Sequence, residues 1–215
     1  MKKDYKKILK HLYLKKANTP AVVDVPKLNY LMVSGAGHPD DESFSLAAQT
    51  LFPVSYVTKF IIKAARPDED FTVMPMEVKW KLDRKQHGSK RYYWTMMIMQ
   101  PECVTNDFVE EAIATVKRKK KYLPYETRLR FQAYNEKLSG QILHIGPYKA
   151  MDQTFELLKK ELTHQGYKWE PDSHDIYYND IRKTPVEKLK SLIRVRIWKK
   201  DRSMCTLDDL FHQWP

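Results

Sequence analysis

The predicted secondary-structure elements follow the same order twice along this chain, and this repeat restricts the possible folds more than any other feature. Each half contains a strand, a glycine-containing turn, a helix and two strands. The turns and following helices are weakly similar, VSGAGHPDDESF in the first half and HIGPYKAMDQTF in the second. Two such units pair naturally about a pseudo-twofold axis, each offering one sheet face to a shared groove. The alternative is two unrelated α+β halves.

Apolar spacing predicts the elements of the first half. An amphipathic helix covers the segment that contains Tyr5 and Tyr13, and a helix that begins near Ser43 is expected to kink at Pro53. Alternating residues predict a strand at 28–33 and a β-hairpin of 71–82 with 91–99.

The second half is predicted in the same way. A helix capped by Thr105 or Asn106 precedes a tyrosine-rich connection. The later elements are a strand at 141–145, a helix from Met151 that stops at Gly166, and strands at 175–178 and 192–198.

We therefore expect an α+β fold of duplicated βαββ units, with extra helices at the N-terminus, between the repeats and at the C-terminus. The expected parts are an N-terminal helix (1–19), one domain (20–200) and a C-terminal tail (201–215). Within the domain, repeat one covers about 27–101, linking helices 105–135, and repeat two about 138–199. Apolar tail residues, among them Leu207 and Trp214, have helical spacing and should dock on the domain.

Composition and motifs exclude several classes of protein. The 215 residues have a net charge of +11 and a mean hydropathy of −0.63, and no apolar run approaches the ~18 residues of a membrane span. No signal peptide is recognisable, so we expect a cytoplasmic protein with Cys103 and Cys205 reduced. Metal-ligand spacing and nucleotide-binding or serine-hydrolase motifs are lacking, so we expect neither a metal nor a cofactor.

The positive charge gathers in two runs. Seven lysines occur from Lys2 to Lys16, and five basic residues occupy Lys117 to Lys121. A basic chain can bind nucleic acid, but both runs lie on amphipathic helices whose polar faces could simply be solvated. No nucleic-acid recognition motif accompanies them, so we do not expect a nucleic-acid partner.

The candidate binding residues are mainly aromatic side chains on predicted strands. Tyr92 and Trp94 share one strand face, Tyr178 ends another strand, and Trp198 lies opposite an apolar face. Met97 belongs to a group of methionines on the hairpin, which would suit a pocket for variable apolar ligands. Each of these residues could instead be part of the core.

Three acidic residues and one histidine are further candidates. Glu77 interrupts an apolar strand, Asp175 opens the strand DIYYND, and Glu187 follows a proline. Each acid could equally be a solvated or capping carboxylate. His144 could be a core histidine or a donor in a pocket.

The second half contains the segments HIGPYKAMDQTFELLKKEL, HDIYYND and RKTPVEKLKSLIRVRI, and the first half contains LNYLMVSGAGHPDD. With these segments the chain resembles the GyrI-like small-molecule-binding domains of SHS2 type. The resemblance covers about residues 20 to 200 and is strongest for the stand-alone subgroup, in which position 175 is often glutamate rather than aspartate. That subgroup includes the cyclopropanoid cyclopropyl hydrolases, which add water to the cyclopropane ring of antibiotics of the yatakemycin and duocarmycin type.

This resemblance implies an aromatic-lined groove that binds planar, hydrophobic or cationic small molecules and a hydrolase that detoxifies DNA-alkylating drugs. A hydrogen bond to the dienone carbonyl would make the strained ring carbon electrophilic. Tyr148 or Tyr178 could supply that bond, while Glu187 or Asp175 orients water. The alternatives are a drug-sequestering module without turnover and a GyrI-type protein that acts on DNA-bound gyrase. The sequence does not indicate the oligomeric state.

The expected aromatic cage consists of Trp94, Tyr148, Tyr178 and Trp198. Truncating any one to Ala should weaken binding of a planar dye by about 1–3 kcal/mol. Stability should fall less than the ~3–5 kcal/mol typical of a core aromatic cut to Ala. Melting temperature and dye affinity measured on the same four variants test this. A variant that melts early but binds normally would identify a core residue.

Overall fold

The structure is a computed structural model that describes residues 2–13, 15–83, 91–119 and 122–199. The expected docking of the C-terminal tail and the hairpin turn at 84–90 lie outside these residues. The strands are β1 (Ala21–Ala36), β2 (Met76–Asp83), β3 (Arg91–Gln100), β4 (Arg130–Ile145), β5 (Tyr167–Trp169), β6 (Ser173–Tyr177) and β7 (Lys190–Lys199). The α-helices are α1 (Tyr5–Ile8), α2 (Lys10–Tyr13), α3 (Glu42–Ala65), α4 (Asn106–Arg118) and α5 (Met151–His164).

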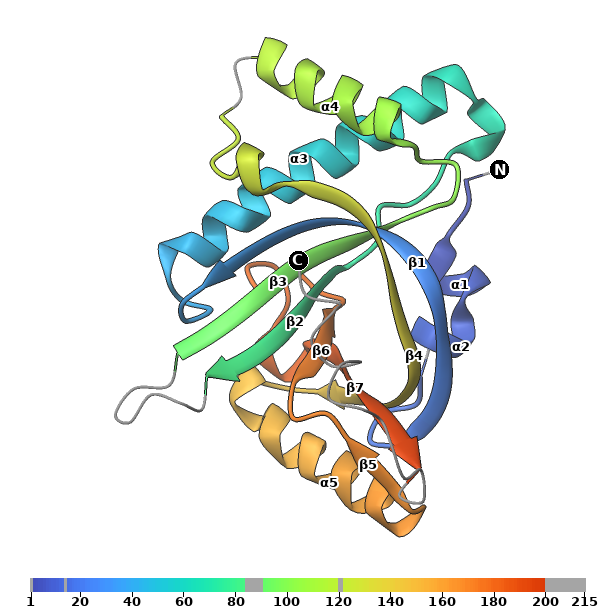
Figure 1. The fold of residues 1–215 in the computed structure, drawn as a ribbon, viewed down its shortest axis with the longest axis vertical. Helices are drawn as coiled ribbons and strands as arrows, with labels where there is room; N and C mark the ends of the chain where they lie inside the picture. The colour runs from blue at the N-terminus through green and yellow to red at the C-terminus, as the bar shows by residue number, and fades with distance from the viewer. Residues whose placement is uncertain (1, 14, 84–90, 120–121, 200–215) are drawn as a thin grey trace.

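The strands form one antiparallel sheet that closes on itself. Their order is β4-β1-β3-β2-β6-β7-β5, and β4 also pairs with β7. Six strands therefore make a barrel-like ring, with β5 added beside the end of β7 (Figure 1). The protein has an α+β fold, and its barrel has an inner and an outer face that alternate residues occupy.

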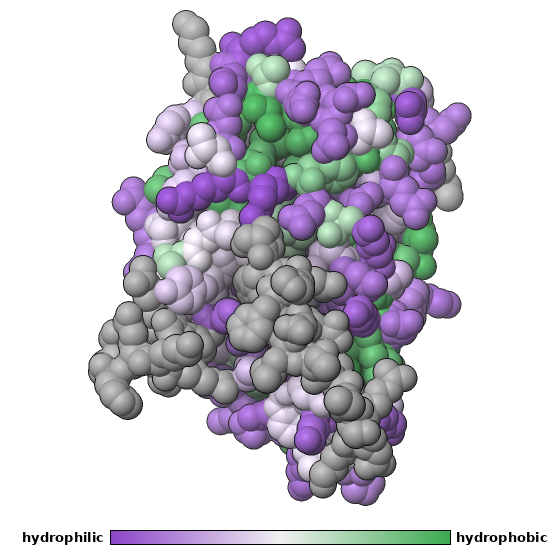
Figure 2. All heavy atoms as spheres, viewed as in Figure 1, coloured by the Kyte–Doolittle hydropathy of each residue, from purple (hydrophilic) through white to green (hydrophobic). Residues whose placement is uncertain are grey.

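Helices cover the outside of the barrel at opposite ends of the molecule (Figure 1). α3 packs on β1 and β3, and α4 lies on α3. α5 packs on β4, where Leu158 and Leu162 bury against Ile193, Val195 and Ile197. β2 and β6 pair with each other between these two helix-covered regions. Polar residues cover much of the face in Figure 2, and apolar residues gather toward the end with α3 and α4.

β1 and β4 are far longer than the strands expected at 28–33 and 141–145. Each has 16 residues, and they pair from Ala21 with Gln141 to Met32 with Arg130. β4 therefore takes up part of the segment expected to hold linking helices at 105–135. Exposed polar residues such as Asp24 interrupt the apolar pattern, because this part of the ladder has one face in solvent.

The N-terminal helix differs from expectation: it is two four-residue helices, α1 and α2, which lie beside the long strands (Figure 1). α3 continues through Pro53 as one 24-residue helix with buried residues on both sides of the proline, so the kink expected at Pro53 does not end the helix. Among the described residues, no helix is both long and apolar enough to cross a membrane.

Other expectations are confirmed. β2 and β3 form the predicted hairpin, and Thr105 is the N-cap residue of α4. The turns after β1 and β4 contain Gly37 and Gly146, with φ of +122° and +134°. Such backbone angles favour glycine, which explains why both turns contain one.

The contact between Gly35 and Trp94 gives a test of the outer packing. A Cβ at position 35 would lie 2.3 Å from Cη2 of the Trp94 ring, which is only 1% exposed. Gly35→Ala should therefore reduce the free energy of unfolding by about 1–3 kcal/mol in urea titrations. In a Trp94→Phe background the cost should shrink, because the smaller ring lacks that atom. Equal costs in both backgrounds would contradict this packing.

Candidate functional site

An aromatic cluster lies where β2 and β6 pair. The indole N–H of Trp80, on β2, donates a hydrogen bond of 3.2 Å to the hydroxyl of Tyr177, on β6. Three further rings contact this pair: Phe44 is stacked on Trp80 at 5.4 Å, Tyr92 meets Trp80 edge-on at 6.2 Å, and Tyr148 meets Tyr177 edge-on at 5.4 Å. All five side chains are partly exposed, although Phe44 covers one face of Trp80. Exposed aromatic surface of this kind suits stacking with a planar molecule.

Asp175 places a buried carboxyl group beside the aromatic cluster. Its Oδ2 accepts a 3.4 Å hydrogen bond from the Tyr177 hydroxyl, and its Oδ1 has no hydrogen-bond partner among the described residues. Burial raises the pKa of Asp175 to about 7, although the nearby His174 partly offsets that rise. Near neutral pH this group can donate a proton or, once ionised, attract a cation or accept a proton from water.

Tyr177 and Tyr148 remain neutral hydrogen-bond donors. Burial raises the pKa of Tyr177 well above its usual value, and the carboxylate of Asp175 raises it further. Burial and Asp180 also raise the pKa of Tyr148. A neutral phenol can donate to a ligand carbonyl, which is the role that ring activation requires.

A second polar group, here called the interior charge cluster, occupies the inside of the barrel and consists of Glu77, Glu136, His174 and Arg194. His174 lies 2.9 Å from Glu77 through Nε2 and 2.9 Å from Glu136 through Nδ1. Arg194 lies 3.2 Å from Glu136. Burial would lower the pKa of His174, but the two carboxylates outweigh it and raise the pKa to about 9. Burial would likewise raise the pKa of Glu136, but His174 and Arg194 lower it to about 2.

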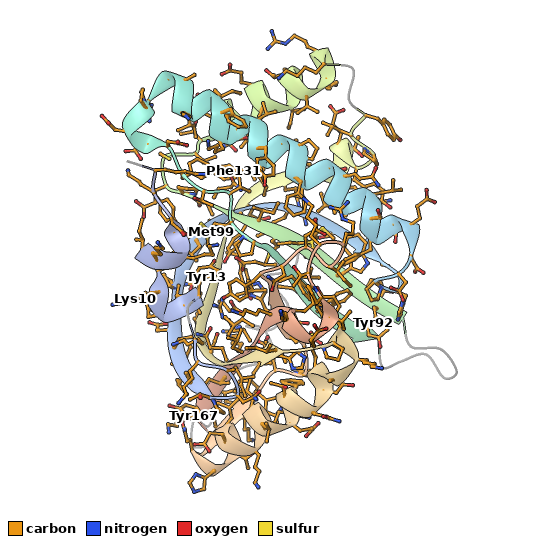
Figure 3. All side chains as sticks on the ribbon, turned by 180° about the vertical axis from the view of Figure 1, so that it is seen from behind. Lys10, Tyr13, Tyr92, Met99, Phe131 and Tyr167 are labelled. Atoms are coloured by element: carbon orange, nitrogen blue, oxygen red, sulfur yellow. The ribbon has the colours of Figure 1, made fainter. Side chains whose placement is uncertain are left out.

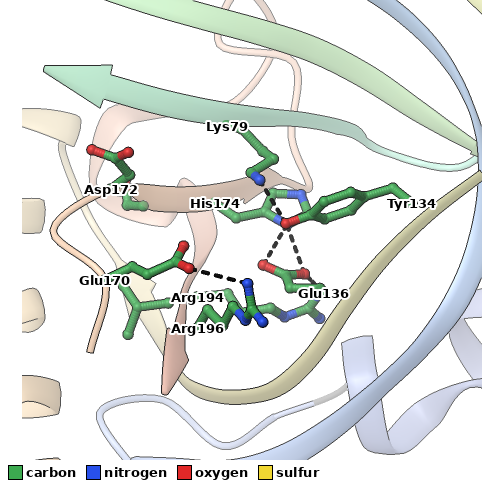
Figure 4. Close-up of a pocket in the computed structure, with 10 residues that line it drawn as sticks. Lys79, Tyr134, Glu136, Glu170, Asp172, His174, Arg194 and Arg196 are labelled. Carbon is green, nitrogen blue, oxygen red and sulfur yellow. Dashed lines mark hydrogen bonds and ion pairs between the residues drawn. The ribbon is translucent and has the colours of Figure 1, made fainter. Parts of the chain in front are cut away.

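The cavity next to this cluster is too small for an organic ligand. It has a volume of about 30 Å³, and its lining includes Lys79, Tyr134, Glu170 and Arg196 as well as residues of the cluster (Figure 4). That space holds a water or two, whereas small-molecule sites typically enclose about 300 Å³ or more. In the described part of the chain, no group of three or more His, Cys, Asp or Glu residues could hold a metal ion. The aromatic cluster with Asp175 is the better candidate site for an organic ligand, because its rings are partly exposed and its carboxyl group has an oxygen without a hydrogen-bond partner among the described residues.

The structure brings three of the sequence-predicted site residues to this site. Asp175 is its carboxyl group, while Tyr148 and Tyr92 are two of its rings. Trp94 lies next to them under the edge of Phe44, but its 1% exposure makes it a core residue in this structure. His144, near the end of β4, is buried; its ring nitrogens form hydrogen bonds with the Thr154 hydroxyl on α5 and with the Pro147 carbonyl in the turn.

The other predicted residues lie elsewhere. Glu187 is exposed on the short turn Val186–Lys188. Glu77 is fully buried in the interior charge cluster, and Met97 pairs with it on the inner face. Trp198 alternates with the outward-facing Ile197, so it shares the inner face with Arg194. Tyr178 donates its hydroxyl to the backbone carbonyl of Tyr13.

Three residues of the aromatic cluster were not among the predicted site residues: Phe44, Trp80 and Tyr177. Trp80 pairs with Trp94 across the hairpin, so it shares a strand face with both predicted hairpin aromatics. Tyr177 is two residues from Asp175 and therefore on the same face. Strand alternation within DIYYND could have identified Tyr177, since it separates Tyr177 from Tyr178. Phe44 becomes part of the site only through the packing of α3.

Comparison with known proteins gives matches among solved structures only; no protein-family model and no curated protein matches the chain. An uncharacterized conserved protein from Listeria innocua is 30% identical over 92% of this chain and 100% of its own, with a TM-score of 0.83. A hydrolase from Listeria innocua is also 30% identical with the same coverage and a TM-score of 0.80. The EcmrR C-terminal domain is 13% identical over 84% of this chain and 98% of its own, with a TM-score of 0.50, a likeness of fold alone.

The raised pKa of Asp175 predicts a specific pH dependence of stability. Its folded pKa of about 7 lies above the unfolded value of 3.8, so the unfolded chain releases this proton first. The contribution of Asp175 to the free energy of unfolding is therefore complete below pH 3.8 and is lost as the pH rises toward 7. Asp175→Asn should remove this loss. Urea unfolding of both proteins between pH 4.5 and 8 measures it, with the exposed Asp24→Asn as control. Parallel pH profiles for wild type and Asp175→Asn would contradict the raised pKa.

Proposed function

The chain belongs to the family of the Listeria innocua proteins described above, and on that premise we propose that it binds planar aromatic small molecules at the aromatic cluster and hydrolyses them. One observation carries the proposal: the buried Asp175 carboxyl has an unpartnered oxygen, among the described residues, next to partly exposed rings. A buried polar atom without a partner costs free energy, and a bound ligand or water would supply the partner. One of the Listeria relatives is named a hydrolase, which supports turnover as well as binding.

The substrate class in this proposal is a cyclopropane conjugated to a dienone, as in drugs of the yatakemycin and duocarmycin type. Trp80 and Tyr177 would stack on the planar drug, and the neutral Tyr148 hydroxyl would donate to its carbonyl. Asp175, in its ionised form, would orient and deprotonate the attacking water. Water adds its oxygen to the ring carbon, the carbon–carbon bond breaks, and its electron pair makes the dienone a phenol after protonation.

We further propose that the chain is a GyrI-like duplication whose two βαββ halves meet at this site. The strand order in the sheet is β1-β3-β2 in the first half and β4-β7-β6 in the second. Along the chain, α3 lies between β1 and β2, and α5 lies between β4 and β6. β1 pairs with β4 and β2 pairs with β6, as a pseudo-twofold axis would require. Trp80 comes from one half and Asp175 from the other, so the site needs both.

Incubation of the purified protein with duocarmycin SA tests the activity. We expect the water adduct by mass spectrometry, and Asp175→Asn should lower the rate by about 10²-fold or more, as loss of a general base does. Trp80→Ala should weaken drug binding about tenfold. Asp24→Asn, an exposed carboxylate on β1, should behave as wild type.

The outcomes separate the two parts of the proposal. Unchanged drug that nevertheless binds tightly would leave a sequestering protein without turnover. Tight binding of ethidium, a planar cationic dye, would support recognition of cations by the ionised Asp175. Full turnover by Asp175→Asn would assign the general base to another residue, and absence of binding to either compound would contradict the proposed site.

A further inference from the structure

The end of helix α2 is held by side chains from inside the barrel. Residues 11–13 present three successive backbone carbonyls there, which a helix C-terminus leaves without helical partners. Side chains from three segments donate to them: Gln141 to His11 at 3.3 Å, Arg194 to Leu12 at 2.9 Å, and Tyr178 to Tyr13. Figure 3 shows Tyr13 at the junction between the N-terminal helices and the barrel. Backbone carbonyls of the N-terminal segment are thus bound by the barrel, in addition to its buried side chains Leu12 and Tyr13.

Tyr178 is the donor that directly follows a residue of the candidate site, Tyr177, in the chain. It directly follows β6, and its backbone N–H donates to the Lys190 carbonyl at 3.1 Å, which continues the pairing of β6 with β7. Its neighbour Tyr177 points to the opposite face, where its hydroxyl contacts Asp175 and Trp80. Fixing the Tyr178 ring on the inner face therefore fixes the direction of the Tyr177 ring on the outer face.

We propose that the N-terminal segment is part of the scaffold of the ligand site, and that Tyr178 acts as a positioning residue which transmits its hold on Tyr13 to Tyr177 and Asp175. This inference rests on the function proposed above. It assigns α1 and α2 a role in the site although neither helix contributes a side chain to the aromatic cluster. It also gives Tyr178 a role without contact to the ligand.

A second bond from the same residue of α2 provides a matched control. The Tyr13 hydroxyl donates to Glu77 on β2 at 2.8 Å, within the interior charge cluster. Tyr13→Phe removes this bond but keeps the carbonyl that Tyr178 holds. Tyr178→Phe removes only the hold on that carbonyl. Both variants lose one buried hydroxyl, so a general loss of stability affects both.

The experiment compares full-length wild type, Tyr178→Phe and Tyr13→Phe. Ethidium affinity is measured by fluorescence, and the amide exchange of Tyr178 by NMR without ligand. For Tyr178→Phe we expect ethidium binding to weaken about two- to tenfold, the effect of one hydrogen bond, with faster amide exchange at position 178 than in wild type. Tyr13→Phe should melt earlier than wild type but keep wild-type affinity and exchange at Tyr178.

A Tyr178→Phe protein with wild-type affinity and unchanged amide exchange at position 178 would overturn the inference, as would equal effects of the two variants. If wild type fails to bind ethidium and duocarmycin SA, the proposed function fails. In that case the amide-exchange data still test the positioning role of Tyr178, because they are measured without ligand.

Discussion

The interior charge cluster is the interaction on which the rest of the barrel depends. Its two carboxylates and two cations come from four different strands, Glu77 from β2, Glu136 from β4, His174 from β6 and Arg194 from β7. Burial of an unpaired charge costs several kcal/mol, so each of these groups requires the others. They meet only when β4 pairs with β7 and β2 with β6, and the cluster therefore favours one closure of the sheet and one register over alternatives.

The two faces of β6 connect this cluster to the candidate site. His174 points inward to its carboxylates, and Asp175 points outward to Tyr177 and the other rings. The positive charge of His174 partly offsets the effect of burial on Asp175, whose pKa reaches about 7 rather than higher. A buried ion network on one side of a strand thereby tunes an acid on the other side, and α2 binds this network through Tyr13 and the Leu12 carbonyl.

Much of the fold follows from local patterns in the sequence, and less of the site does. Alternation gave the hairpin, and apolar spacing with capping gave α4 and α5. The full lengths of β1 and β4 were missed because exposed polar residues interrupt their apolar pattern. Asp175, Tyr148 and Tyr92 were found as candidates, but Trp80 and Tyr177 were not, and Trp94 is buried. The burial of Trp94 depends on the packing of α3. A local sequence pattern does not contain that packing.

The sequence by itself determined the order of the elements, the glycines of the two turns and which residues alternate on each strand, because these depend on near neighbours in the chain. Only the tertiary structure decided which strand face is inside, because that depends on closure of the ring between β4 and β7. The same closure made Glu77 a partner of His174 instead of a ligand contact, and left Asp175 with the aromatic rings. Ion pairs between residues far apart in the sequence favour this inner face. Local sequence patterns do not show which of these residues will meet.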